Sequence, residues 1–298
     1  MYPGRFAYFA PSSLEEALST LDRYGDEARV LAGGQSLIPL MKLRLAEPAA
    51  LVDVNRVEGL DGLSEAEGYL RIGALARHRT CERSELLRRR YRVLADTAPL
   101  VSDPIVRNLG TVGGSLAHAD PQGDWGSALL AAGAEAVARS SVGSRSIPLA
   151  EFFQGPFTTA LEPNEILESV RVPAPPGRSG GAYLKLERKV GDFATVGVAV
   201  HLSFDDGVVG RAGIALTAVG PTNLTAPAAE RALAGAELTD EAIAEAARLA
   251  AEAADPRDDL RGSADYKRGV VRVFTERALR RAAAAAGQEH DQTEGAPR

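Results

Sequence analysis

The sequence feature that most limits how this chain can fold is a pair of glycine-rich turns, each followed by a serine. The first reads Ala32-Gly33-Gly34-Gln35-Ser36, and the second reads Thr111-Val112-Gly113-Gly114-Ser115. Adjacent glycines allow the backbone to reach positive φ and to bring its N–H groups close to a ligand. Successive N–H groups in such a turn form a concave anion site that suits phosphate. Two such turns predict a ligand with more than one phosphate, which points to a dinucleotide held from two sides.

The first turn matches neither G-x-G-x-x-G nor G-x-x-x-x-G-K-[ST], so a Rossmann or P-loop site is disfavoured. Taken alone, it is equally well interpreted as an ordinary connection between a strand and a helix, with Ser36 as the helix N-cap. The second turn is harder to explain structurally, because Gly110 adds a third glycine and hydroxyls at Thr111 and Ser115 flank the pair.

An acidic residue, Asp124, follows the second turn. A carboxylate beyond a phosphate turn suits a sugar hydroxyl of the ligand. The alternative makes Asp124 the N-cap of the helix that follows it. Both roles can hold at once, since two carboxylate oxygens can accept from different partners.

Composition excludes several classes of protein. The chain has 298 residues, 45% of them hydrophobic and 25% charged, as in an ordinary globular protein. A net charge of −6 argues against a primary nucleic-acid binder, which normally carries a basic stripe. No apolar run approaches the length of a membrane span, and the first residues lack the apolar core of a signal peptide. We therefore expect a cytoplasmic protein.

The single cysteine, Cys81, limits the chemistry that the chain can perform by itself. It rules out an internal disulfide, a Cys-ligated iron–sulfur cluster and a Cys-rich zinc site. The four histidines are scattered, so no metal site is expected. Redox chemistry here would need an organic cofactor.

The order of the predicted elements indicates two domains. A strand at 29–32, a helix at 36–44 and a strand at 51–54 predict a parallel β-α-β unit around the first turn. Further on we expect a strand at 69–72, a helix at 80–91, an irregular stretch at 103–124 and a helix ending near 132. A proline- and glycine-rich linker at 173–181 then marks the domain boundary. Beyond it, strands at 182–188, 194–204 and 209–219 precede helices at 227–234, 240–254 and 264–286, which indicates an α+β domain. Asp206-Gly207 predicts a hairpin turn between the last two of these strands.

Two side chains after the linker are candidate ligand contacts. Phe193, between two predicted strands, could cover a flat heteroaromatic ring, and Lys185 or Lys189 could lie near a negative charge on that ring. The alternative is a plain turn with an aromatic side chain packed beneath it. No nucleophile with an adjacent base is evident, so no catalytic residue is assigned.

The two turns, together with Leu37 to Leu45 and the segment Gly191-Asp192-Phe193, resemble the FAD-binding medium subunit of molybdenum hydroxylases, in particular the carbon monoxide dehydrogenase medium chain. The same module occurs in xanthine dehydrogenase and in quinoline, nicotine and hydroxybenzoyl-CoA enzymes. The resemblance covers nearly the whole chain. Carbon monoxide dehydrogenase chains tend to have His at position 35 and Tyr at position 193, so Gln35 and Phe193 weaken the case for carbon monoxide as the substrate.

The resemblance implies an α+β fold with a two-subdomain FAD-binding domain over 1–175, split near 57. A C-terminal domain over 180–286, with a three-stranded antiparallel sheet and a helical bundle, would follow, and 287–298 would form a disordered tail. By motif, the FAD contacts would be Ala32, Gly33, Gly34, Gln35, Ser36, Thr111, Gly113, Gly114, Ser115, Asp124, Lys185 and Phe193.

The implied partners are a small [2Fe–2S] subunit and a large molybdopterin subunit, in a dimer of heterotrimers. The chain would receive electrons on FAD from the small subunit and pass them to an external acceptor. Two alternatives stay open at this point: a self-sufficient FAD oxidoreductase that acts directly on a small substrate, and an FAD-binding module without a redox role.

Overall fold

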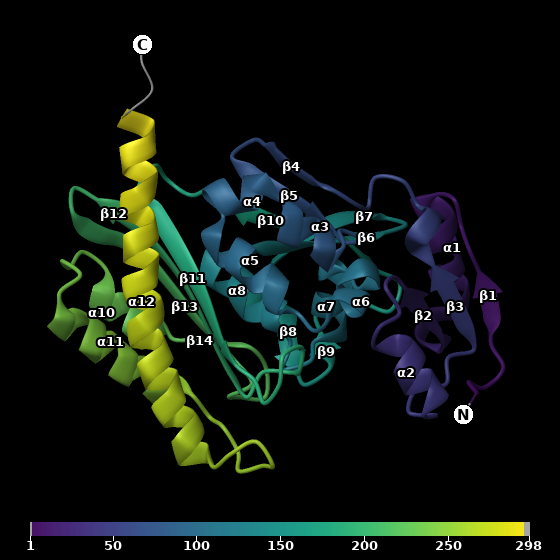
Figure 1. Cartoon of the computed structure of the whole chain (residues 1–298). Helices are drawn as coiled ribbons and strands as arrows, with labels where there is room; N and C mark the ends of the chain where they lie inside the picture. Colours follow the sequence, from purple (N-terminus) through teal and green to yellow (C-terminus); the bar gives the residue numbers. More distant parts are fainter. Residues whose placement is uncertain (1, 295–298) are drawn as a thin grey trace.

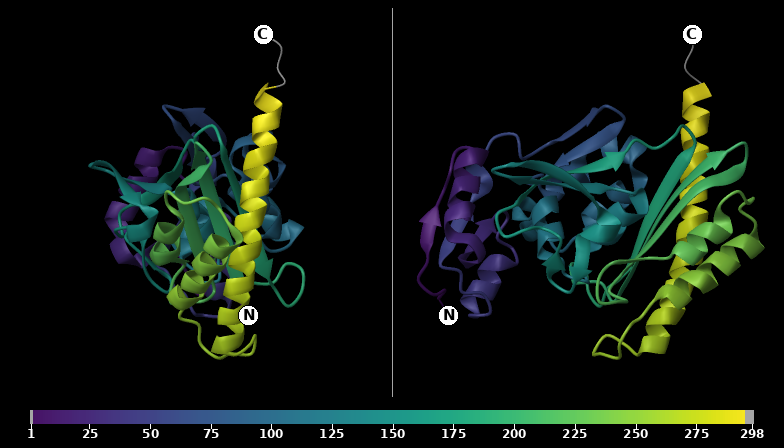
Figure 2. Two further views of the ribbon diagram at one scale, coloured as in Figure 1. Left: turned by 90° about the vertical axis from the view of Figure 1, so that its left-hand side faces the viewer. Right: turned by 180° about the vertical axis from the view of Figure 1, so that it is seen from behind.

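The computed structural model describes residues 2–294, which form three units in a row (Figures 1 and 2). An N-terminal unit with a small parallel sheet stands at one end. A middle unit contains a five-stranded sheet and several short helices. The C-terminal unit, at the other end, is a twisted sheet covered by three helices, of which α12 (Ala264–Glu294) runs along its whole length (Figure 1).

The N-terminal unit is built around the first glycine turn. Strands β2 and β3 pair in parallel, as the β-α-β prediction requires, and α2 connects them. A strand that was not predicted, β1, pairs in parallel with the other edge of β3, so the order is β1-β3-β2. Helix α1 packs Ala17, Leu18 and Leu21 into the core. The bounds are β1 Ala7–Phe9, α1 Leu14–Tyr24, β2 Ala28–Leu31, α2 Leu37–Lys42 and β3 Ala50–Asp53.

The middle unit is an antiparallel sheet in the order β4-β5-β10-β6-β7. Helices α3 to α9 pack around it, and β8 and β9 form a separate small hairpin. The bounds are β4 Leu63–Ala66, β5 Tyr69–Gly73, α3 His78–Arg83, α4 Glu85–Arg90, α5 Arg92–Thr97, α6 Pro104–Leu109, α7 Val112–His118, α8 Asp124–Ala132, β6 Glu135–Ser140, β7 Gly143–Pro148, α9 Leu149–Phe152, β8 Phe153–Gly155, β9 Thr158–Thr159 and β10 Ile166–Pro173.

Two predictions for this unit are wrong. The helix expected over 80–91 is two helices, because Ser84 adopts an extended backbone and its hydroxyl accepts from the Leu87 N–H to begin α4. The stretch 103–124, expected to be irregular, contains α6 and α7. Asp103 caps α6 by accepting from the Val106 N–H at 2.8 Å, and Pro104 occupies the first turn.

The C-terminal unit has four antiparallel strands in the order β11-β12-β13-β14, and not the three expected, because the two-residue strand β14 adds to β13. The Asp206-Gly207 turn between β12 and β13 has positive φ at both residues (48° and 90°), as the hairpin prediction requires. The bounds are β11 Ser179–Leu186, β12 Val196–Asp205, β13 Val208–Thr217, β14 Leu224–Thr225, α10 Pro227–Leu233, α11 Asp240–Ala253 and α12 Ala264–Glu294.

Helix α12 differs from the prediction at its end. A disordered tail was expected over 287–298, whereas the helix continues through Glu294, and residues 295–298 lie outside the described residues. The helix lies close against β11, where a β-carbon on Gly180 would overlap the carbonyl oxygen of Ala282. Glycine at this position lets the helix approach the sheet.

The middle and C-terminal units share a buried interface built on α8. All nine residues of α8 are buried, and the helix packs against α5, β12 and β13. Trp125 is completely buried there. The first turn of α8 is therefore fixed between the two units, which determines where Asp124 lies.

In the described part of the chain, no helix combines the length and the apolar character that a membrane span requires.

Candidate cofactor-binding site

The first glycine segment, Ala32–Ser36, connects the end of β2 to α2, and its two glycines are required for different reasons. Gly34 has a φ of 70°, a left-handed conformation that favours glycine. Gly33 has negative φ, but a β-carbon there would overlap the carbonyl oxygen of Leu109 and lie 2.7 Å from the α-carbon of Gly110. The segment thus turns sharply and presses against the chain that precedes the second glycine segment.

A run of backbone N–H groups in the first segment has no acceptor. Among the described residues, no hydrogen bond is donated by the N–H groups from Gly33 to Leu37, and the first to donate is that of Ile38, to the Gly34 carbonyl at 3.1 Å. Ser36 stands at the N-cap position of α2, but its side chain makes no capping bond. The Gln35 side-chain amide instead donates to the Gly33 carbonyl at 2.9 Å and holds the loop in shape. Successive unpaired N–H groups at a turn form an anion site.

The second segment, Thr111–Ser115, is built differently, because it is the start of α7. Thr111 is the N-cap, and its hydroxyl accepts from the Gly114 N–H at 3.0 Å. The N–H groups of Val112 and Gly113 donate to the carbonyls of Ala76 and Ala74. Neither Gly113 nor Gly114 has positive φ, so of these four glycines Gly34 alone uses the conformation that adjacent glycines allow.

Close packing is the reason for glycine in this second segment. A β-carbon on Gly113 would lie 2.5 Å from the β-carbon of Ala74, and one on Gly114 would lie 2.7 Å from the Thr111 hydroxyl oxygen. The second segment is therefore a tightly packed wall rather than a second array of free donors.

The two segments lie next to each other, at the junction between the N-terminal and middle units (Figure 1). Gly33 touches the Leu109–Gly110 backbone, and a β-carbon on Gly114 would lie 3.8 Å from that of Ala32. The fold thus brings together two parts of the chain that the sequence places far apart.

Asp124 and Lys185, predicted separately, are bonded to each other. The Lys185 ammonium donates to the Asp124 carboxylate at 2.9 Å and to the Leu100 carbonyl at 2.8 Å. The Lys185 side chain is only 1% exposed. The Tyr183 hydroxyl donates to the other Asp124 oxygen at 2.7 Å. Burial raises the pKa of Asp124 above its ordinary value, while the lysine and the tyrosine oppose this shift.

The N-cap interpretation of Asp124 is wrong. Gly123 is the N-cap of α8, and Asp124 is the first helical residue, with its carboxylate turned to β11. Sequence reasoning did not find Tyr183. The available signal was the alternation along β11, which puts residues 183 and 185 on one face of the sheet.

Phe193 lies on the loop between β11 and β12 and is 51% exposed. Arg261 holds this loop by donating to the Phe193 carbonyl at 2.9 Å and to the Asp192 carboxylate at 3.1 Å. The hydrogen bond from Arg261 lowers the pKa of Asp192 to about 2. Within residues 2–294, no hydrogen bond joins Phe193 to either glycine segment. The loop does approach the chain before α6, since a β-carbon on Gly191 would lie 3.3 Å from the Ser102 backbone.

Three further residues at the junction gave no signal in the sequence: Asn55, Arg77 and His78. Asn55 and Arg77 hydrogen-bond to the glycine segments or their flanks. His78 is buried and accepts a hydrogen bond from the indole N–H of Trp125 at 2.9 Å through Nδ1. Burial, together with the nearby Arg107 and Arg77, lowers the pKa of His78 to about 4.

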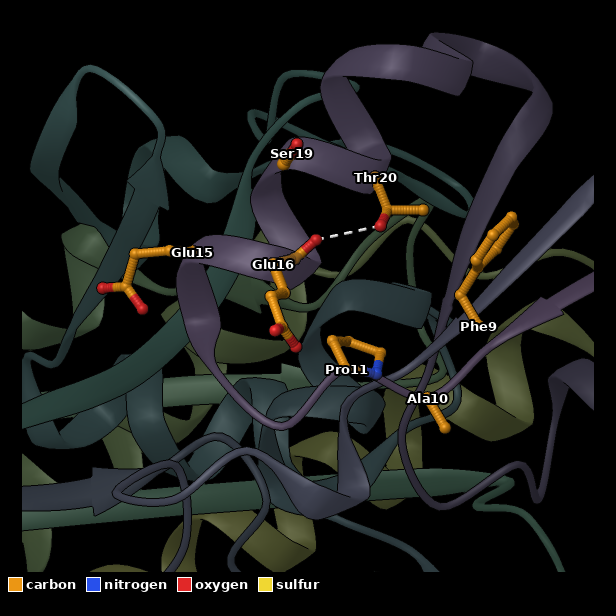
Figure 3. Close-up of a pocket in the computed structure, with 7 residues that line it drawn as sticks. All are labelled: Phe9, Ala10, Pro11, Glu15, Glu16, Ser19 and Thr20. Atoms are coloured by element: carbon orange, nitrogen blue, oxygen red, sulfur yellow. Dashed lines mark hydrogen bonds between the residues drawn. The ribbon is translucent and has the colours of Figure 1, made fainter.

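A pocket elsewhere on the described surface lies apart from the two glycine segments. Figure 3 shows a shallow pocket on α1, where the Thr20 hydroxyl donates to the Glu16 carbonyl at 2.9 Å. It shares no residue with the glycine segments. No cluster of three or more His, Cys, Asp or Glu side chains in the described chain is arranged to hold a metal ion.

Comparison with known proteins identifies similar sequences and structures along nearly the whole chain. Residues 4–175 match the family described as the FAD binding domain in molybdopterin dehydrogenase, and residues 181–282 match the CO dehydrogenase flavoprotein C-terminal domain. The carbon monoxide dehydrogenase medium chain of Hydrogenophaga pseudoflava is 42% identical over 94% of this chain and 97% of its own. Subunit alpha of the 6-hydroxypseudooxynicotine dehydrogenase complex of Paenarthrobacter nicotinovorans is 38% identical over 95% and 96%.

Solved structures agree with these sequence matches. A structure of carbon monoxide dehydrogenase from Hydrogenophaga pseudoflava superimposes with a TM-score of 0.92 at 44% identity, covering 96% of this chain and 99% of that one. Quinoline 2-oxidoreductase from Pseudomonas putida 86 gives a TM-score of 0.89 at 35% identity, covering 96% and 99%.

Proposed function

The chain belongs to the family of FAD-binding subunits of molybdopterin dehydrogenases, and from this premise we propose that it accepts electrons from a [2Fe–2S] subunit and passes them to an external acceptor. It is an oxidoreductase subunit with FAD as its cofactor. FAD, when bound, supplies reversible electron transfer. The residues of this chain bind and orient the cofactor, and none of them is assigned an acid–base role.

The observation that carries the proposal is the run of unpaired N–H groups from Gly33 to Leu37 beside the start of α7. A diphosphate needs several convergent donors and close approach of the backbone, and glycines provide both. The first segment, Ala32–Ser36, would bind the diphosphate through its N–H groups. The second, Thr111–Ser115, would form one side of the site with its packed backbone and would offer the hydroxyls of Thr111 and Ser115, because most of its N–H groups already have acceptors.

Three residues outside the segments complete the proposed site. Asp124 would accept from a ribose or ribityl hydroxyl with the lone pairs that Tyr183 and Lys185 leave free. Lys185 would then lie near the cofactor through its bond to Asp124. Phe193, half-exposed on a loop that Arg261 holds, would lie beside the flavin ring.

The proposed partners are a small [2Fe–2S] subunit and a large molybdopterin subunit, assembled as a dimer of heterotrimers. Several relatives are named as medium chains or as subunits of dehydrogenase complexes, which supports the assignment of this chain to a larger assembly. The lone cysteine, Cys81, is buried and cannot ligate a cluster by itself, so an iron–sulfur cluster that supplies the electrons would lie in another chain.

The test is anaerobic mixing of the FAD-loaded full chain with the reduced [2Fe–2S] subunit. We expect the flavin absorbance to bleach and to recover when an acceptor is added. If the chain alone turned over a small substrate, it would be a self-sufficient oxidoreductase. If it bound FAD but the small subunit could not reduce it, it would be a binding module without a redox role.

A further inference from the structure

A chain of hydrogen bonds connects the two glycine segments through the side chains of Asn55 and Arg77. The Asn55 amide donates to the carbonyl of Ala32, the first residue of the first segment, at 2.8 Å. The Asn55 amide oxygen accepts from the Arg77 guanidinium at 2.7 Å. The other arm of Arg77 donates to the carbonyl of Leu109, two residues before Thr111. Two side chains thus span from one segment to the approach of the other.

The Leu109 carbonyl is where this chain of bonds and the glycine packing meet. The same oxygen that accepts from Arg77 is the atom that a β-carbon on Gly33 would overlap. Arg77 therefore holds in place the backbone against which the first segment rests. Arg77 also forms an isolated β-bridge with Thr111, so its own backbone is tied to the second segment.

The N-terminal end of the chain of bonds is anchored in the parallel sheet. Asp53, at the end of β3, accepts from the Asn55 side chain at 2.7 Å and from the Asn55 backbone N–H at 3.0 Å. The Tyr8 hydroxyl, from β1, donates to the same carboxylate at 2.6 Å. Burial opposes ionisation of Asp53, but the bonds from Tyr8 and Asn55 hold its pKa below the ordinary value. Asn55 is thereby fixed in orientation, although it lies on the surface.

The Arg77 guanidinium binds neutral oxygens. Among the described residues, no carboxylate oxygen forms an ion pair with it, and its guanidinium donates to a side-chain amide oxygen and to a backbone carbonyl. A planar guanidinium presents donors in fixed directions, so it can join two acceptors at a set separation. This geometry favours a role in spacing over a role in charge neutralisation.

We propose that Asn55 and Arg77 form a brace that sets the spacing of the two glycine segments, and so act as positioning residues for the FAD diphosphate. The brace joins the N-terminal unit to the middle unit across the place where the cofactor binds. The inference rests on the proposed function, since it concerns the same site. Neither residue needs to touch the cofactor for the brace to act.

The test compares FAD affinity, measured by flavin fluorescence titration of the cofactor-depleted full chain, in Asn55→Ala, Arg77→Gln and the double variant. Because either substitution breaks the brace, each should weaken FAD binding by about tenfold. The double variant should bind FAD no more weakly than the single variant with the lower affinity. Arg71→Gln is the matched control. Arg71 also donates to a backbone carbonyl, that of Gly59, at 2.8 Å, and lies 3.8 Å from the Glu168 carboxylate, but it has no hydrogen bond to either segment among the described residues, so FAD affinity should stay within about twofold.

Each alternative outcome is distinct. If Arg77→Gln weakened binding and Asn55→Ala did not, Arg77 would act on the ligand by its charge, and the brace would be refuted. The brace would also be refuted if the losses of binding free energy in the two single variants added up in the double variant, because the contributions of independent contacts are additive. Wild-type affinity in all three variants would refute the brace and leave the proposed function intact. Failure of the wild-type chain to bind FAD would overturn the proposed function instead. Urea unfolding of each variant without FAD separates loss of affinity from loss of fold.

Discussion

Lys185 and Asp124 form a buried ion pair between the C-terminal unit and the middle unit, with 2.9 Å between Nζ and Oδ2. Each member of the pair has one further hydrogen-bond partner, since Leu100 accepts from the lysine and Tyr183 donates to the aspartate. A buried pair of this kind adds little net stability, because both charges lose their hydration, but removal of one partner is costly because the other charge is left buried alone. The residues that the sequence singled out as cofactor contacts therefore also join two parts of the fold.

Replacing Lys185 with Met should destabilise the protein by about 3–5 kcal/mol, because the Asp124 carboxylate would stay buried without its cation. Urea unfolding of the cofactor-free chain measures this. The control is Arg44→Gln, which breaks the exposed pair of Arg44 with Glu47 and should cost less than about 1 kcal/mol. Equal stability of the two variants would contradict the interpretation of the Lys185–Asp124 pair.

Replacing Gly33 with Ala should lower FAD affinity by about tenfold or more, since the new β-carbon must displace the Leu109 backbone that shapes the site. Gly177→Ala is the control, because no atom lies within contact distance of a β-carbon there. Fluorescence titration with FAD compares the two. Unchanged affinity in Gly33→Ala would mean that the two segments need not touch for binding.

Stability should decrease as the pH falls from about 6.5 to 4. Burial, together with nearby arginines, lowers the pKa values of His78 and His201 from 6.5 to about 4. Both histidines are neutral in either state above pH 6.5, but below it the unfolded chain takes up protons that the folded chain does not. Each should therefore remove about 1.4 kcal/mol per pH unit over this window. Chemical unfolding at several pH values measures the slope, and His78→Gln with His201→Gln should flatten it. A slope that the double variant leaves unchanged would disprove the assignment to these two groups.

Replacing Arg261 with Ala should release the loop that carries Phe193. Arg261 holds both the Asp192 carboxylate and the Phe193 carbonyl, and its side chain is only 16% exposed. Hydrogen exchange of the 188–193 backbone should accelerate by on the order of tenfold. Arg188→Ala is a close control, since Arg188 reaches the same carboxylate at 3.4 Å from a 59% exposed position and should matter little. Similar exchange in both variants would show that Arg261 does not hold the loop.

The sequence predicted the elements whose signals are local. The Asp206-Gly207 turn and the strand–turn–helix around Gly33 depend on backbone preferences of the residues themselves. Strands β1 and β14 were not predicted, because segments this short are strands only through their pairing with another strand. The end of one helix and the start of the next at Ser84 were not predicted, because a serine within a helical pattern does not by itself indicate that it caps a new helix.

The candidate site shows the same division. The glycine positions could be located from the sequence, but the reason for each glycine could not. Gly34 is needed for positive φ, whereas Gly113 is needed because Ala74, from another part of the chain, packs against it. The roles of Asn55, Arg77 and Tyr183 depend on partners far along the chain. The assignment of the twelve predicted contacts to FAD stays a prediction that the variants above can test.

The unequal construction of the two glycine segments has a consequence for how such a chain can be recombined. The free donors belong to the N-terminal unit, and the wall that shapes them is bonded to Ala74 and Ala76 in the middle unit. A chimera joined near residue 57 would take donors from one parent and wall from the other. Such an exchange should retain FAD binding only if the backbone at position 109 of one parent packs against the glycine at position 33 of the other.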